Sequence, residues 1–173
     1  MTTISSSKTL SLNLIDNSGI DRLIIVPREP GDVTGHIDGM IRFIDKERII
    51  VGSYPASYTK GKDNISEVKL EEGKAFSKYL IDKLSKSFEV IRVQNSIPRK
   101  GPYEFPGAFG NYINFLRIGS KVILPQYNIP EDEPAKEQFR KCFKDSDIKL
   151  LNKDVDLLSY YGGVINCISC QIY

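Results

Sequence analysis

Two residues in one short segment of this sequence carry side chains that could move a proton and hold a cation. His36 and Asp38 lie in GDVTGHIDGMIRF, residues 31–43, and His36 is the one histidine of the chain. Imidazole exchanges a proton near neutral pH, and a carboxylate binds cations. A spacing of two places both side chains on the same face of an extended backbone, so they could act on one ligand. The alternative is a structural or exposed histidine in a glycine-rich turn.

Cysteine supplies a third candidate. Cys167 follows two glycines in GGVINCIS, and a thiolate is a strong nucleophile where a neighbouring positive charge favours its formation. The alternative is a buried, apolar strand residue. Cys142 falls in a predicted amphipathic helix and is expected to be structural. Cys170 forms Cys-x-x-Cys with Cys167, but in a strand the two side chains would point to opposite faces, which disfavours a shared metal ion or a disulfide.

Length and composition limit the classes of protein. The chain has 173 residues, 40% of them hydrophobic, which suits a single domain with one sizeable core. Its 24 Lys and Arg against 22 Asp and Glu give a net charge of +2, which does not indicate a nucleic-acid or anionic membrane partner. The start of the chain does not read as a signal peptide, and no run of about 18 apolar residues occurs. We therefore expect a soluble, cytoplasmic protein.

The elements that must position these side chains are strands and helices in alternation. In the first part of the chain we expect a hairpin around the charged residues 45–48, a helix with Leu70, Phe76, Tyr79, Leu80 and Leu84 near helical spacing, and a strand after it. The expected ranges are a short helix at 8–18, a buried strand at 23–27, the hairpin at 41–54, the helix at 70–86 and the strand at 88–93.

The pattern then starts again after an irregular loop. Prolines and glycines concentrate in residues 94–110, which predicts a surface loop. A second hairpin, helix and strand are expected at 111–127, 130–144 and 148–153, and a last strand that carries the cysteine at 162–173. The two hairpin–helix–strand units, roughly 36–95 and 108–153, form an internal repeat within one domain, residues 1–173.

Three segments in this order resemble the agmatine deiminase and bacterial peptidylarginine deiminase family. They are GDVTGHIDGMIRF, PGAFGNYINFLRIGSKVILPQY and YGGVINCISCQ, and they match the C-terminal half of family members. The family belongs to the guanidino-group-modifying, or pentein, superfamily. The resemblance implies an α/β fold, a propeller of five ββαβ units around an axis, of which this chain would form about half.

The resemblance also implies a reaction and its residues. The reaction is hydrolysis of a guanidino group to a ureido group with release of ammonia, from agmatine or an arginine derivative, as in polyamine biosynthesis, with no cofactor and no metal. Cys167 would be the nucleophile, His36 the proton carrier and Asp38 the carboxylate that holds the guanidinium. Asn114, Gly162 and Gly163 match positions that line the substrate. Arg42 matches a recurrent arginine, for which we expect a solvated place at a strand end.

The sequence also departs from the family. Asn166 stands where the family usually has histidine, and Val164 replaces a glycine. Full-length members carry further carboxylates in an N-terminal half that residues ahead of Leu23 do not match. The alternative function is therefore a non-catalytic remnant or binding subunit, and the expected partner of either form is a second copy or a separate N-terminal half.

Overall fold

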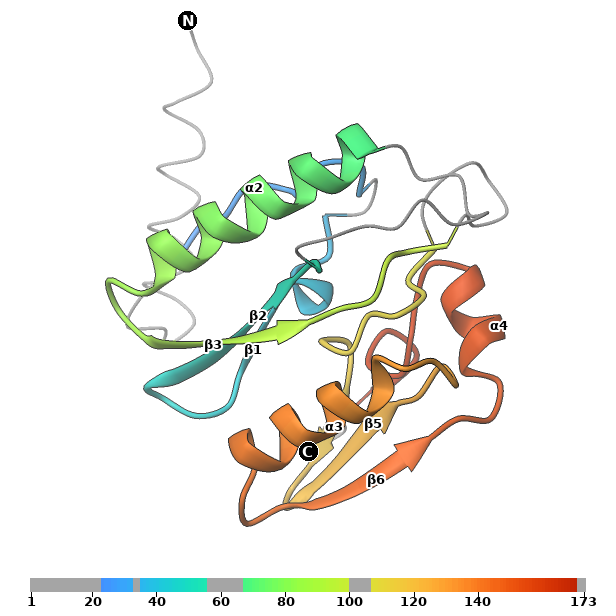
Figure 1. The fold of residues 1–173 in the computed structure, drawn as a ribbon. Helices are drawn as coiled ribbons and strands as arrows, with labels where there is room; N and C mark the ends of the chain where they lie inside the picture. Colours follow the sequence, from blue (N-terminus) through green and yellow to red (C-terminus); the bar gives the residue numbers. More distant parts are fainter. Residues whose placement is uncertain (1–22, 33–34, 56–66, 100–106, 171–173) are drawn as a thin grey trace, which may run out of the picture.

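The computed structural model describes residues 23–32, 35–55, 67–99 and 107–170. These residues form a mixed α/β structure with two three-stranded sheets, and each sheet has its own long helix (Figure 1). The helix predicted at 8–18 lies outside the described residues.

The first sheet and its helix come from residues 41–94. Strand β1 (Ile41–Phe43) pairs antiparallel with β2 (Arg48–Ser53), and helix α2 (Glu67–Leu84) leads to β3 (Glu89–Gln94), which pairs parallel with β2. The charged turn between β1 and β2 is closed by Asp45, whose carboxylate accepts hydrogen bonds from the backbone of Glu47 and Arg48. The predicted hairpin, helix and strand are thus confirmed.

The second sheet has the same order and the same pairing. Strand β4 (Leu116–Ile118) pairs antiparallel with β5 (Lys121–Pro125), and helix α3 (Asp132–Cys142) leads to β6 (Asp147–Leu151), which pairs parallel with β5. Acidic residues begin α3 and basic residues end it, as the helix dipole favours. The chain therefore contains two ββαβ units, and α3 of the second unit contacts β3 of the first.

Helix α2 packs one face on the first sheet. Its buried positions recur every three or four residues, as expected for an amphipathic helix, and they meet the inner face of β2 in one cluster: Met40, Ile41, Ile49, Val51, Phe76, Leu80, Ile81 and Leu84. Tyr79, predicted at an apolar position, is instead 46% exposed. The apolar face of the helix contains Ile81 and not Tyr79, so the Tyr79 ring points to solvent. Its hydroxyl accepts a hydrogen bond from Lys83.

The larger core joins both units. It contains Ile50 and Val93 from the first sheet, Val122 and Leu124 from the second, and a group of aromatic rings. The ring of Phe115 lies at 5.0 Å, centroid to centroid, from that of Phe139 on α3. Since one continuous core includes residues of both sheets, the two units support each other rather than folding as separate bodies.

Two predicted strands are wrong. Residues 23–27 make no ladder; Ile24 and Val26 pack on the first core while Ile25 is 62% exposed. The stretch that follows Lys153 forms helix α4 (Val155–Tyr160) and then turns, so residues 162–170 hold no strand. Both segments are apolar enough for a strand, but among the described residues neither forms a ladder with another strand.

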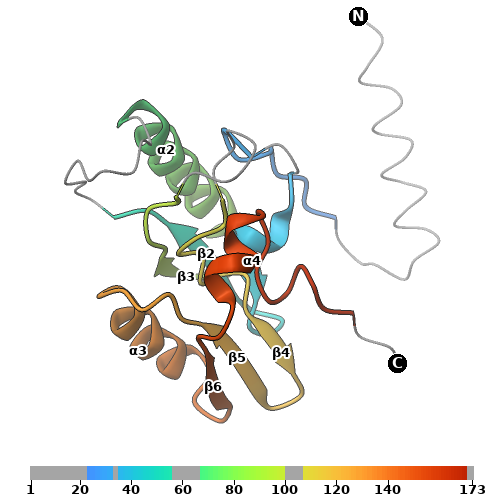
Figure 2. The ribbon, with the colours of Figure 1, turned by 90° about the vertical axis from the view of Figure 1, so that its right-hand side faces the viewer.

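The predicted surface loop is only partly at the surface. Asn95, Ser96 and Phe109 are buried, and the Ser96 N–H donates to the carbonyl of Gly110 at 2.9 Å, which ties the two ends of the loop together. In Figure 2, α4 is drawn above the second sheet, at about the same height as β2 and β3. The N–H of Ala108 donates to Ser159 on α4, so the loop end and this helix pack together.

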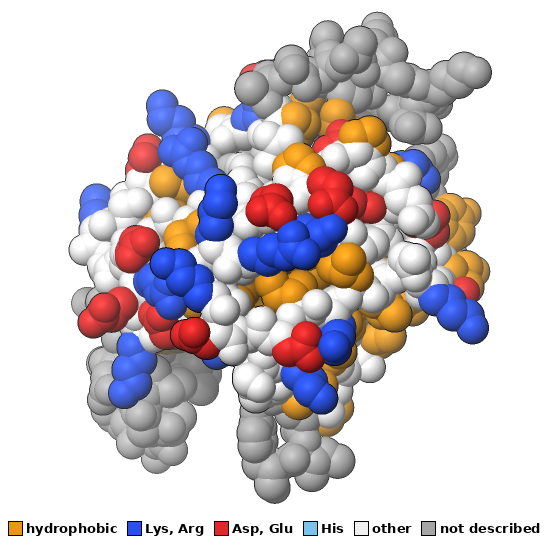
Figure 3. Space-filling view, turned by 60° about the horizontal axis from the view of Figure 1, so that its bottom comes forward, with side chains coloured by type: hydrophobic (Ala, Val, Ile, Leu, Met, Phe, Trp, Pro, Cys, Tyr) orange, Lys and Arg blue, Asp and Glu red, His pale blue; other side chains and the backbone are white. Residues whose placement is uncertain are grey.

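The surface carries charges of both signs. On the face drawn in Figure 3, basic and acidic side chains lie intermingled around apolar groups. Among the described helices, none is both long and apolar enough to cross a membrane.

Candidate active site

A short 3-10 helix, η1 (Ile37–Gly39), carries the first two candidate residues. His36 occupies its N-cap, and the N–H of His36 donates to the Asp32 carboxylate at 3.2 Å. The preceding Gly35 has φ +69°, a conformation that glycine adopts without strain. The expected extended backbone is found at His36, which has φ −75° and ψ 111°, whereas Asp38 lies in the 3-10 helix itself.

Backbone hydrogen bonds hold η1 against the first sheet. The N–H of Met40 closes the turn on Ile37, and the Met40 carbonyl accepts from Gly52 on β2 at 2.9 Å. From the other side, the Asn111 amide donates to the Gly39 carbonyl at 3.1 Å. The position of His36 and Asp38 therefore depends on both units.

Cys167 lies in a turn after α4 and not in a strand. Gly162 ends α4 with φ +89°, and its N–H donates to Ser159. A Cβ at Gly163 would lie 3.1 Å from Cys167 Cβ and 3.7 Å from its sulfur, so the chain approaches Cys167 closely there. The turn itself is closed by the Ser169 N–H, which donates to the Asn166 carbonyl at 3.1 Å.

The three candidate residues lie together in space. The ring nitrogen of His36, a carboxylate oxygen of Asp38 and the sulfur of Cys167 are all within 4.8 Å of one another. His36 and Cys167 are exposed and Asp38 is half-buried, so a ligand could reach the group from solvent. Within the described part of the chain, these side chains are also the one group close enough to share a metal ion.

Two asparagines organise the carboxylate and the sulfur. Asn114, which is buried, donates from Nδ2 to Asp38 Oδ2 at 2.8 Å and to Cys167 Sγ at 3.2 Å. Its Oδ1 accepts from the backbone N–H groups of Asn166 and Cys167, at 3.1 and 3.3 Å. Asn166 donates from its own Nδ2 to Asp38 Oδ2 at 2.7 Å. One carboxylate oxygen therefore receives two amide donors.

Arg42 brings a positive charge to the same place. Its guanidinium carbon lies 4.7 Å from the centroid of the Phe115 ring, and the side chain is half-buried. Burial lowers the pKa of Arg42, and the neighbouring Asp38 and Cys167 oppose that change. The expected solvated strand-end arginine is therefore wrong, because β1 turns this side chain inward toward the site.

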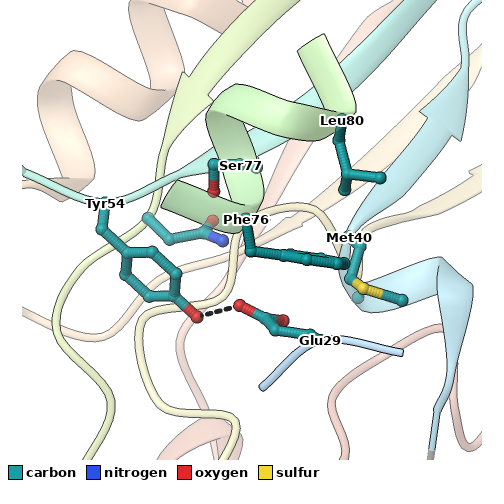
Figure 4. Close-up of a pocket in the computed structure, with 9 residues that line it drawn as sticks. Glu29, Met40, Tyr54, Phe76, Ser77 and Leu80 are labelled. Atoms are coloured by element: carbon teal, nitrogen blue, oxygen red, sulfur yellow. Dashed lines mark hydrogen bonds between the residues drawn. The ribbon is translucent and has the colours of Figure 1, made fainter. Parts of the chain in front are cut away.

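Beside η1 lies a small pocket whose lining includes Glu29, Tyr54 and Gly39. Figure 4 shows the Tyr54 hydroxyl directed at Glu29, below the ring of Phe76, and the hydrogen bond is 2.6 Å long. Burial raises the pKa of Glu29, with the charge of Asp32 adding to this and the Tyr54 hydrogen bond opposing it. Tyr54 also has a raised pKa, chiefly through burial. The pair anchors the segment that leads to His36.

Replacing Glu29 with glutamine should stabilise the protein more at pH 8 than at pH 5. A carboxyl group whose pKa is raised by folding contributes stability below its ordinary pKa and loses it as the pH rises through the raised value. Glutamine keeps an oxygen for Tyr54 without the charge, so we expect a gain on the order of 1 kcal/mol or less at pH 8. Urea unfolding at both pH values measures it. The exposed Glu47→Gln is the control, and a gain that is equal at both pH values would contradict the prediction.

Sequence reasoning missed the parts played by Asn166 and Arg42. Asn166 was noted as a departure, yet its amide contacts a carboxylate 128 residues away. Arg42 alternates with the apolar Ile41 and Phe43, which indicates that it lies on the opposite face of a strand. The alternation does not indicate which face of the strand is covered by other parts of the chain. Asn114 lies beside Asp38 and Cys167, as predicted, but the hydrogen bonds of its amide are made with protein atoms.

Comparison with known proteins identifies relatives of one kind. The model of the Porphyromonas-type peptidyl-arginine deiminase family matches residues 5–172. A protein of Streptococcus mutans, whose name gives agmatine deiminase as a provisional assignment, is 30% identical over 160 residues, which are 83% of this chain and 41% of that protein. The chain thus spans about two fifths of the length of this relative.

Solved structures show the same fold. The agmatine deiminase of C. jejuni superposes with a TM-score of 0.72 at 20% identity, over 93% of this chain and 45% of that one. The agmatine deiminase of Enterococcus faecalis gives 0.67 at 22% identity, over 93% and 47%. The two ββαβ units and the segment with Cys167 thus correspond in fold to part of these larger chains.

Proposed function

The chain belongs to the Porphyromonas-type peptidyl-arginine deiminase family, and from that premise we propose that it carries the reactive residues of a cysteine-dependent guanidino hydrolase. The observation that carries the proposal is the approach of His36, Asp38 and Cys167 to within 4.8 Å of one another from distant parts of the chain. A nucleophile, a proton carrier and a carboxylate are the groups that this hydrolysis uses.

The first half of the reaction forms a covalent intermediate. Asp38 accepts hydrogen bonds from the planar guanidinium and holds its carbon over the sulfur. The Cys167 thiolate attacks that carbon, and the new C–S bond gives a tetrahedral intermediate. A C–N bond then breaks as protonated His36 delivers a proton to the departing nitrogen. Ammonia leaves, and an amidino-thioether remains on Cys167.

The second half of the reaction releases the product and regenerates the Cys167 thiolate. Neutral His36 takes a proton from a water molecule, whose oxygen attacks the amidino carbon. The C–S bond breaks and Cys167 is again a thiolate, while the remaining hydroxyl proton passes through solvent to the released ammonia as the ureido product leaves. The sum is one guanidinium and one water converted to one ureido group and one ammonium ion. Asp38 is half-buried and Cys167 is exposed, so a guanidinium can approach both from solvent.

The preferred substrate is agmatine, ahead of an arginine derivative. Both carry the same guanidino group, and several relatives are named as agmatine deiminases. Among the described residues, the mutually close group contains one carboxylate, whereas a guanidinium has several N–H groups to satisfy. We therefore include in the proposal a further carboxylate from a second copy of the chain or from a separate partner.

The single carboxylate also favours a second candidate, a non-catalytic subunit that binds guanidino compounds weakly. Such a subunit would keep Asp38 and its amide partners but would form no covalent adduct. The two candidates therefore differ in what happens at Cys167.

Incubation with agmatine and with an arginine-containing peptide tests the proposal. We expect release of ammonia, and intact-protein mass spectrometry of acid-quenched samples should show an adduct equal to agmatine less ammonia. Size-exclusion chromatography with light scattering gives the oligomeric state in the same buffer. Saturable binding of agmatine without adduct or ammonia, at every protein concentration tested, would favour the binding subunit over the hydrolase.

A further inference from the structure

We propose that Asn114 is a positioning residue that allows the Asp38 carboxylate and the Cys167 thiolate to be negatively charged side by side. The proposal rests on the proposed function, since it assigns Asn114 a part in preparing that nucleophile. It differs from a substrate-binding role, because the contacts of the Asn114 amide are made with the protein.

The two charges that need separating are close. Cys167 Sγ lies 3.7 Å from Asp38 Oδ2. Two like charges at that distance disfavour one another, so an isolated pair of this kind would keep the thiol protonated. A protonated thiol does not attack a guanidinium carbon.

Asn114 Nδ2 is within hydrogen-bond distance of both of these atoms. Its two N–H groups serve two acceptors, Asp38 Oδ2 at 2.8 Å and Cys167 Sγ at 3.2 Å. Each hydrogen bond favours the charged form of its acceptor. Because Asn114 is 2% exposed, water does not compete strongly for these donors.

The oxygen of the same amide fixes its orientation. Oδ1 accepts from the backbone N–H groups of Asn166 and Cys167. If the amide were rotated by 180°, Nδ2 would face these two donors and could accept from neither. The backbone carbonyl of Asn114 also accepts from the Asn166 N–H at 3.3 Å. The donor pair is therefore locked toward the carboxylate and the sulfur.

Other groups near the sulfur do not replace this amide. Asn166 Nδ2 donates to Asp38 alone. Arg42 acts on both anions through its charge, and so does the His36 ring when it is protonated, since its nitrogen lies within 4.8 Å of the sulfur. Within the described residues, Asn114 is the side chain that donates to the carboxylate and to the sulfur at once. Its removal should affect the thiol more than removal of the Asn166 amide.

The test measures alkylation of Cys167 by iodoacetamide from pH 5 to 10, followed by peptide mass spectrometry in a Cys170→Ser background. Asn114→Asp keeps an oxygen for the two backbone N–H groups and replaces the donor with a carboxylate. We expect its alkylation midpoint to rise by about one pH unit or more, which is about a tenfold slower reaction at pH 7. Asn152→Asp, at an exposed position, adds the same charge and should leave the midpoint unchanged.

Asp38→Asn tests the same interaction in the opposite direction. It removes the neighbouring charge, so the midpoint should fall, and the double variant Asn114→Asp, Asp38→Asn should return toward the original value. A folded Asn114→Asp protein with an unchanged midpoint would overturn the proposal. If that variant does not unfold cooperatively, an unchanged or raised midpoint in Asp38→Asn overturns it instead. The assay uses no substrate, so a failure to release ammonia counts only against the proposed hydrolase.

Discussion

Replacing Cys167 with alanine should lower ammonia release from agmatine by about 10³-fold or more. Alanine supplies no nucleophile, so neither the tetrahedral intermediate nor the amidino-thioether can form. The adduct should disappear from the mass spectrum together with the ammonia. Agmatine binding should persist, because Asp38 keeps its hydrogen bonds from Asn114 and Asn166.

Cys170 gives the matched control for this change. It is a second exposed, free cysteine three residues away, and Cys170→Ser should leave ammonia release unchanged. An enzyme that loses activity equally with either substitution would respond to disturbance of the turn rather than to loss of the nucleophile. Full activity in Cys167→Ala would remove the proposed mechanism.

Replacing Gly110 with alanine should destabilise the protein by about 3 kcal/mol or more. Gly110 has φ +74°, which costs an L side chain about 1–2 kcal/mol. A Cβ would lie 2.4 Å from Ser96 Cβ and 3.1 Å from Ser96 Cα, and forcing such an overlap apart costs typically about 1–3 kcal/mol. Because the Gly110 carbonyl accepts from Ser96, moving the backbone away breaks a hydrogen bond.

Gly119→Ala separates the two costs. Gly119 also has a positive φ, +56°, in the turn between β4 and β5, but a Cβ there would meet nothing within 4 Å. We expect about 1–2 kcal/mol from the backbone term alone. Urea unfolding followed by circular dichroism measures both free energies. Equal losses for the two variants would mean that Ser96 yields easily and that the close approach is unimportant.

Periodicity predicted the regular parts of the fold because the information is local. Two apolar, β-rich runs around a charged turn predicted the hairpin of β1 and β2, and apolar residues three or four apart predicted α2. The wrong strands at 23–27 and 162–170 have a different cause. A strand needs a second strand to pair with, and within the described part of the chain neither segment pairs with one.

The site was less predictable than the fold. His36 and Asp38 lie two residues apart in the sequence, but their link to Cys167 came from the family resemblance rather than from any pattern in the chain. The amide contacts of Asn114 and Asn166 depend on which segments meet after folding. The inward direction of Arg42 depends on Phe115, which belongs to the other unit.

The span of chain between the reactive groups also sets when the site forms during folding. The bond between Asn166 and Asp38 closes a loop of 128 residues, and the entropic cost of closure rises with the logarithm of loop length. Hairpins and helices form early and locally, whereas contacts of such separation form late. During refolding, the helical circular dichroism signal should therefore recover first and the native alkylation rate of Cys167 last. The alkylation rate of this thiol would then report the final step of folding.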